Sequence, residues 1–129
     1  MDGRHLIMTQ DLKKSLVLLK ALIFHYHGLD LDEKKILEDY VKKLDAQEEY
    51  EWAIGFISQD YMSAFERSKE FLSKEIKPLG DDQKLNYLME TWEDNHRKGY
   101  VTEMETTAML NLAKDWAIEK NFLMAINHA

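Results

Sequence analysis

Residues 29–54 read LDLDEKKILEDYVKKLDAQEEYEWAI, and residues 101–126 read VTEMETTAMLNLAKDWAIEKNFLMAI. The two stretches align without a gap, 72 positions apart. Their identical pairs are Glu33/Glu105, Lys42/Lys114, Ala53/Ala125 and Ile54/Ile126, and apolar residues pair at Leu37/Met109, Tyr40/Leu112, Val41/Ala113, Leu44/Trp116 and Tyr50/Phe122. Similarity at a fixed spacing indicates an internal duplication. We therefore predict one domain, residues 1–129, built from two copies of a single unit.

The composition favours helices and excludes several classes of protein. The chain has 129 residues, of which 45% are hydrophobic, with one proline and five glycines, so long stretches contain no residue that breaks a helix. We therefore predict an all-α fold. Its formal charge of −7 would repel a phosphate backbone, which argues against nucleic-acid binding. The lack of cysteine excludes disulfides and thiolate metal sites and is compatible with a reducing cytoplasm.

The most apolar run, from Ser15 to Phe24, is too short to span a bilayer and contains Lys20. No small-residue cleavage site follows it, so a signal peptide does not fit either. We predict a cytoplasmic protein without a membrane span.

Apolar spacing predicts about seven helices. Leu12, Leu16, Leu19, Ile23 and Tyr26 follow one helical face, and this first helix is apolar on its other sides too, which predicts a central position. A second helix after Asp30 is expected to bury Leu37, Tyr40, Val41 and Leu44. The remaining helices are expected at residues 47–58, 61–77, 82–98, 103–120 and 122–127. Repeat one spans residues 12–58 and repeat two residues 82–127. A linker helix within residues 60–77 joins them, carries Met62, Phe65, Leu72 and Ile76, and ends at Pro78.

The helix ends repeat as well. Asp30 with Glu33, and Thr102 with Glu105, have the spacing of a capping box. Each first helix ends His-x-x-Gly, at His25–Gly28 and at His96–Gly99. We predict two structural repeats around two central helices, which pack antiparallel and so keep His25 and His96 apart.

The stretch Gly99-Tyr100-Val101-Thr102-Glu103-Met104-Glu105, continued by Leu112-Ala113-Lys114-Asp115-Trp116, resembles the TerB-like family, named for tellurite-resistance proteins. The resemblance extends over roughly residues 12–126. It implies a TerB-like multihelical domain with two structural repeats. It also implies a bacterial protein linked to chemical stress, tellurite or phage resistance, or an accessory domain of a larger protein.

The family's acidic residues at the glycine turns have been proposed to bind divalent metal. The resemblance places Glu33 and Glu105 at two of these positions. The aspartate usual before each turn glycine is replaced by His27 and Lys98, and a lysine cannot ligate a hard cation. We therefore expect no metal site and no cofactor.

Two further groups of residues have side chains of the types that ligate metal ions. His25, His27, Asp30 and Asp32 are close in sequence and suit zinc or nickel, but histidines at helix ends also bond the last carbonyls. Glu93 and His96 form one Glu-x-x-His pair, whereas di-iron bundles need two. The structural interpretation is preferred for both. If a metal binds, the candidate ligands are His25, Glu33, Glu93, His96 and Glu105.

The acidic run Glu48, Glu49 and Glu51 beside Trp52 could dock a basic partner or could simply solvate a helix, and the second reading is preferred. The sequence contains no glycine-rich phosphate loop and no catalytic motif. We expect a non-enzymatic interaction or scaffold domain with a protein partner. The alternative is a divalent-metal sensor or a metal-dependent enzyme, and the sequence leaves a homo-oligomer open.

Overall fold

The computed structural model describes residues 9–25, 31–97 and 101–127, and all the regular structure within these ranges is helical. This agrees with the predicted all-α class. The seven α-helices are α1 (Gln10–Phe24), α2 (Leu31–Leu44), α3 (Gln47–Ser58), α4 (Ala64–Ile76), α5 (Asp81–Arg97), α6 (Glu103–Asp115) and α7 (Glu119–Asn127), with a short 3-10 helix η2 (Tyr61–Ser63) before α4.

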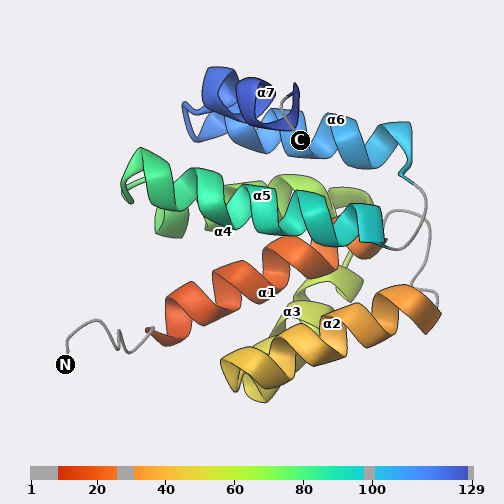
Figure 1. Cartoon of the computed structure of the whole chain (residues 1–129). Coiled ribbons are helices and arrows are strands. Elements are labelled where there is room, and N and C mark those ends of the chain that lie inside the picture. Colours follow the sequence, from red (N-terminus) through yellow and green to blue (C-terminus); the bar gives the residue numbers. More distant parts are fainter. Residues whose placement is uncertain (1–8, 26–30, 98–100, 128–129) are drawn as a thin grey trace, which may run out of the picture.

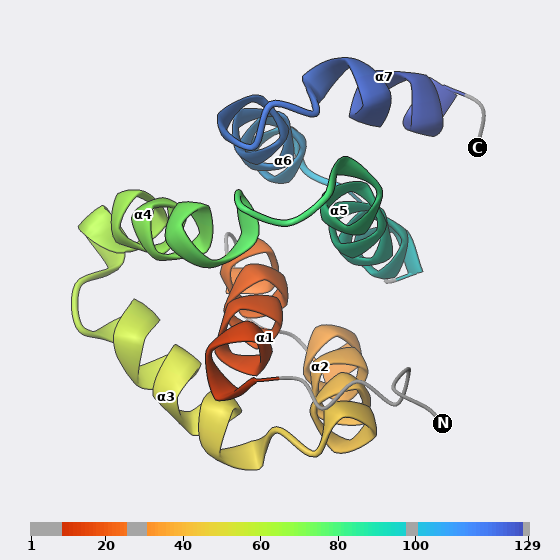
Figure 2. The same ribbon diagram turned by 90° about the vertical axis from the view of Figure 1, so that its left-hand side faces the viewer.

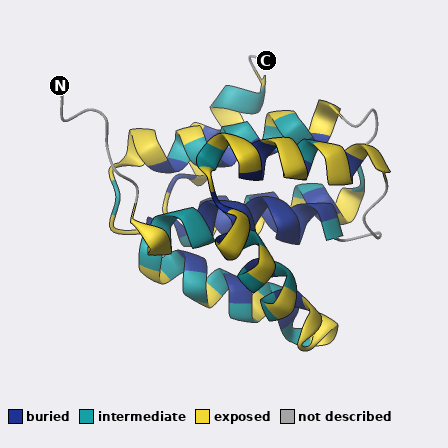
Figure 3. Ribbon diagram, turned by 90° about the horizontal axis from the view of Figure 1, so that it is seen from below, coloured by how far each residue is buried: buried dark blue, intermediate teal, exposed yellow. Residues whose placement is uncertain are grey.

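Helix α1 is the centre of the fold. Every residue from Ser15 to Phe24 is buried, as expected for a helix that is apolar on all sides. Helices α2, α3, α4, α5 and α6 all contact it, and Figure 2 shows them arranged around it. In Figure 3, α1 appears as the continuous dark-blue stretch in the interior. One core built on α1 therefore accounts for the packing of these five helices.

Helix α5 differs from the prediction of a second central helix. Its buried residues are Lys84, Leu88, Thr91 and Asn95, which form one stripe, while residues such as Glu93 and His96 remain exposed. The predicted antiparallel arrangement is also wrong: α1 and α5 run in the same general direction, and α2 and α6 return in the opposite direction (Figure 1). The chain thus forms two antiparallel helical hairpins, α1–α2 and α5–α6, and the two hairpins have the same orientation.

The turns after α2 and α6 have the same geometry, 72 positions apart. Asp45 and Ala117 are the non-glycine residues with positive φ among the described residues, at 53° and 61°. After α2, the N–H of Ala46 donates to the carbonyl of Val41 at 2.9 Å, and the N–H of Asp45 donates to that of Lys42 at 3.1 Å. These two bonds form the Schellman motif that ends many helices.

The same two bonds recur after α6. The N–H of Ile118 donates to the carbonyl of Ala113 at 2.9 Å, and the N–H of Ala117 donates to that of Lys114 at 3.1 Å. Helix α6 was predicted to continue to residue 120, but it ends at Asp115 because Ala117 adopts the left-handed conformation. Helix α7 accordingly begins at Glu119 rather than at residue 122.

In each hairpin, a lysine side chain from the first helix donates a hydrogen bond to a backbone carbonyl at the C-terminal end of the second helix. In the first hairpin, Nζ of Lys13 on α1 donates to the carbonyl of Asp45 beyond α2, at 3.2 Å. In the second, Nζ of Lys84 on α5 donates to the carbonyl of Trp116 beyond α6, at 2.9 Å. Cations suit these positions because the C-terminal end of a helix presents unpaired carbonyls and a partial negative charge.

The predicted capping box at the start of α6 is confirmed. Oγ1 of Thr102 accepts from the N–H of Glu105 at 3.2 Å, and Oε1 of Glu105 accepts from the N–H of Thr102 at 2.8 Å. The cap predicted at Asp30 lies outside the described residues, as do His27, Gly28, Lys98 and Gly99.

Candidate functional site

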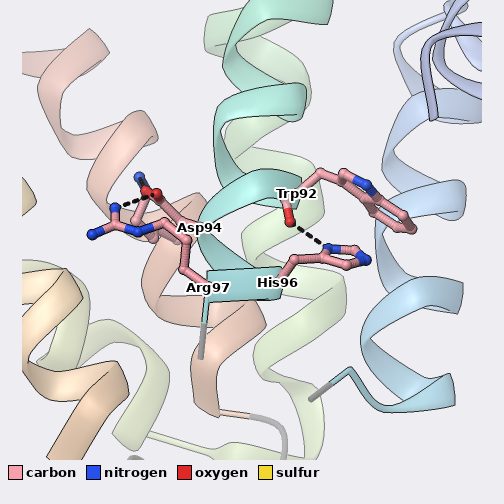
Figure 4. Close-up of polar contacts among 5 residues, drawn as sticks. Trp92, Asp94, His96 and Arg97 are labelled. Carbon is pink, nitrogen blue, oxygen red and sulfur yellow. Dashed lines mark hydrogen bonds and ion pairs between the residues drawn. The ribbon is translucent and has the colours of Figure 1, made fainter. Parts of the chain in front are cut away.

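The two repeat-related histidines each bond to their own helix. Nδ1 of His25 lies 2.7 Å from the carbonyl oxygen of Ala21, and Nδ1 of His96 lies 2.8 Å from that of Trp92. Figure 4 shows His96 beside the Trp92 ring, on the side of α5 away from Asp94. This is the helix-end role of histidine, in which the ring bonds a carbonyl of the last turn.

The other candidate ligands do not join them in a cluster. Glu93 is exposed, whereas Glu33 and Glu105 are fully buried. Oε1 of Glu105 accepts from Nδ2 of Asn95 at 3.3 Å in addition to its bond to the N–H of Thr102. Within the described ranges, no three His, Asp or Glu side chains are placed to hold a metal ion.

The acidic run on α3 is not one continuous surface. Glu48 and Glu51 are exposed, but Glu49 is buried with 7% of its surface accessible. The Trp52 ring beside them packs on Phe56, with ring centroids 5.1 Å apart. This side of α3 therefore contributes to packing as well as to solvation.

A buried ionic cluster connects the two hairpins. Lys20 on α1 has no exposed surface, and its Nζ forms an ion pair with Oδ2 of Asp94 on α5. The same ammonium lies 3.4 Å from the ring centroid of Tyr40 on α2, a cation–π contact. Arg97 is a second partner of Asp94, at 2.9 Å (Figure 4). Burial lowers the pKa of Lys20 below its usual value, against the opposing effect of Asp94.

Tyr40 is the other buried ionisable residue of this cluster. Burial raises the pKa of its hydroxyl well above the ordinary value, and the negative charge of the Glu90 carboxylate raises it further. Because Lys20 is fully buried, its amine is not accessible to a solute, so the cluster is structural.

Lys20 itself was the signal of this cluster in the sequence, because a charge within an apolar run is buried only when a partner is present. Nothing in the sequence identified Asp94 as that partner.

An apolar groove lies at the C-terminal end of α1, between the start of α4 and the start of α6. It consists of two hollows of about 340 and 430 Å³, and Phe65 and Met104 line both. We call it the Met62–Met104 groove. Its lining residues are Leu22, His25, Ile57, Tyr61, Met62, Ala64, Phe65, Glu103, Met104, Thr107, Ala108 and Asn111.

Three large apolar side chains of this groove are in solvent. Met62 is 95% exposed, Tyr61 66% and Met104 60%. Met62 was predicted to lie in the regular linker helix. It lies instead in η2, because Asp60 caps this short helix and the regular helix α4 begins only at Ala64. The groove was not predicted, since its walls come from segments that are far apart in the sequence.

The turn that presents Met62 is held by polar contacts. The Asp60 carboxylate accepts from the N–H of Met62 at 3.1 Å and from the Ser63 hydroxyl at 2.9 Å. These hydrogen bonds lower the pKa of Asp60. Nη2 of Arg67 donates to the carbonyl of Asp60 at 2.8 Å, and Nη1 donates to that of Phe56 at 2.8 Å. These hydrogen bonds therefore hold in place the turn from which the exposed Met62 side chain extends.

Comparison of the chain with protein-family models, with curated proteins and with solved structures gives no match in any of the three. Among the described helices, none is both long enough and apolar enough to cross a membrane.

Proposed function

We propose that this protein is a non-enzymatic interaction domain that binds a protein partner in the Met62–Met104 groove. The observation that carries the proposal is the exposure of Tyr61, Met62 and Met104 around two adjoining hollows. Contiguous exposed apolar surface is costly in water and marks interaction sites on many proteins. Methionine suits such a surface because its flexible thioether chain adapts to different partners.

We also propose that the two hairpins are copies of one unit and that the domain is TerB-like. The matching turns at Asp45 and Ala117 support the duplication, as do the lysine bonds to the ends of α2 and α6. The resemblance of residues 99–105 and 112–116 supports the family assignment. On this basis we propose a bacterial, cytoplasmic protein with a role in the response to chemical stress such as tellurite.

The proposal is tested by affinity capture from the source organism. Met62→Glu with Met104→Glu places charge in the groove, and Leu123→Glu with Met124→Glu places the same charge on exposed apolar residues of α7. We expect a protein that the parent and the α7 variant both retain and that the groove variant loses. Equal retention by all three proteins would contradict a binding role for the groove.

Elemental analysis of the untagged protein tests the alternative, a metal sensor or metal-dependent enzyme. We expect less than stoichiometric zinc, nickel, iron or manganese. One metal ion per chain, lost in a variant of His25, Glu93 or His96, would favour the alternative.

A further inference from the structure

We propose that the partner in the Met62–Met104 groove is a cationic amphipathic helix, whose apolar side chains enter the two hollows and whose Lys and Arg side chains face an acidic rim. This inference rests on the proposed interaction function and names the chemistry of the partner.

The shape of the groove suits one face of a helix. Phe65 and Met104 line both hollows, so the two adjoin each other between α4 and α6. A helix bound in a groove inserts apolar residues spaced by three or four positions, which lie one turn apart on the same face. Two adjoining hollows can receive two such residues. Met62 and Met104 are the exposed, flexible side chains that would close over them.

The charges around the groove are acidic. Among the described residues that line the two hollows, Glu103 is the acidic one, and none is a lysine or an arginine. Asp60, which precedes Tyr61 and Met62, is exposed and adds a second carboxylate next to the groove. The whole chain carries a formal charge of −7. Complementary charge favours a cationic partner in both association rate and specificity.

One cation near this rim, Arg67, already forms hydrogen bonds within the protein. The guanidinium of Arg67 donates to the carbonyls of Phe56 and Asp60 and to the Ser63 hydroxyl, and it lies 4.8 Å from the Phe56 ring centroid. These hydrogen bonds hold Arg67 against the turn, and Glu103 remains the acidic residue among the described residues that line the hollows.

A second copy of this chain fits the groove poorly. In a symmetric pair, each groove would meet the same groove, so Asp60 and Glu103 would face carboxylates of the other copy. Like charges across an interface cost several kcal/mol, on the order of the binding energy of a weak complex. Charge thus selects a different, basic partner over self-association.

The test uses two synthetic amphipathic helical peptides with identical leucine faces, one bearing lysines and one bearing glutamates on the polar face. Methionine methyl groups labelled with ¹³C report binding in the 129-residue chain by NMR. We expect the lysine peptide to shift the Met62 and Met104 methyl signals and to bind at least about tenfold more tightly than the glutamate peptide. A lysine peptide of the same composition with its leucines scrambled should lose most of this affinity.

Matched variants locate the site. Met62→Gln with Met104→Gln should weaken the lysine peptide at least about tenfold, which corresponds to about 1.4 kcal/mol. Leu123→Gln with Met124→Gln should leave its affinity unchanged, because these residues lie on α7, where Lys120 rather than a carboxylate lines the hollow beside Met124.

Several results would overturn the proposal. Equal affinity for the two peptides would exclude a cationic partner but leave a groove-binding function in place. Groove signals that change with protein concentration alone would identify a second copy as the occupant. A shift confined to Met124 would place peptide binding on α7. If no methyl signal responds to either peptide and the groove variant also fails to alter capture, the proposed function is wrong as well.

Discussion

Lys20 of α1 and Asp94 of α5 form an ion pair that joins the two hairpins inside the protein. Lys20 is completely buried, and 14% of the Asp94 side chain is exposed. The Tyr40 ring of α2 lies against the same ammonium, so three helices meet at one charge. A buried charge is tolerated only with its partner present, which makes this contact a requirement for the way α5 packs on α1 and α2.

The first prediction concerns the removal of that partner. Asp94→Ala leaves the Lys20 ammonium buried without its carboxylate and should lower the free energy of unfolding by about 3–5 kcal/mol. Arg97→Ala is the matched control, because Arg97 also contacts Asp94 but is 64% exposed. It should cost less than about 1 kcal/mol. Urea denaturation measures both, and equal losses would show that burial of Lys20 does not set the energetics of the cluster.

The second prediction is a loss of stability at alkaline pH. Burial raises the pKa of Tyr40, and to a smaller degree that of Tyr50 and Tyr87, above the ordinary value of 10.0. The unfolded chain therefore releases these protons first, so the stability present below about pH 10 is lost as the pH rises through and beyond that value. The lowered pKa of Lys20 acts in the opposite direction below 10.5.

Tyr40→Phe isolates the largest of these contributions. The variant loses the hydroxyl next to the Glu90 carboxylate, and its stability at pH 7 should differ from that of the parent by no more than about 1 kcal/mol. Its stability should then fall less steeply than that of the parent above pH 10. Urea denaturation at pH 7, 9 and 11 makes the comparison. Parallel pH profiles for the two proteins would assign the alkaline loss to other groups.

The third prediction concerns the start of α6. Thr102→Ala removes the hydroxyl that accepts from the N–H of Glu105 and should cost about 1 kcal/mol. Thr107→Ala makes the same substitution at an exposed position within the helix and should be neutral or slightly stabilising. Thermal unfolding of the two variants decides the point. A Thr107 variant as unstable as the Thr102 variant would mean that the cap contributes nothing specific.

The fourth prediction tests the turn shared by the two hairpins. Ala117 has a φ of 61°, a conformation that glycine adopts without strain and β-branched residues resist. Ala117→Gly should be neutral or stabilise by up to about 1 kcal/mol, whereas Ala117→Val should destabilise by about 1–2 kcal/mol. Asp45→Gly and Asp45→Val should behave in the same order, with a φ of 53° at that position. Opposite orders at the two positions would contradict their equivalence.

Much of the fold could be predicted from the sequence because helix periodicity and end signals are local. The bounds of α3 agree with the prediction, and Thr102 and Glu105 form the predicted capping box. The end of α6 was predicted wrongly, since an alanine at position 117 carries no sign that it adopts a left-handed conformation. Which side of α5 stays exposed depends on which helices pack against it. The sequence of α5 alone does not show this.

The candidate site was less accessible to sequence analysis. The spacing of His25 and His96 suggested related roles, and both do bond carbonyls one turn back in their helices. The groove could not be inferred, because Met62 and Met104 come from segments with no pattern in common. Lys20 signalled a buried partner, but Asp94 is one acid among many, and only the packing of α5 on α1 selects it.

Photo-crosslinking in living cells tests the central claim, that the Met62–Met104 groove is the partner-binding surface. A photoreactive phenylalanine analogue replaces Met62 in one protein and Met124, a control on α7 that is 54% exposed, in another. We predict a discrete crosslinked species for position 62 that is absent for position 124 and disappears when Met104→Glu is added. No crosslink at position 62, or the same crosslinks at both positions, would contradict the account.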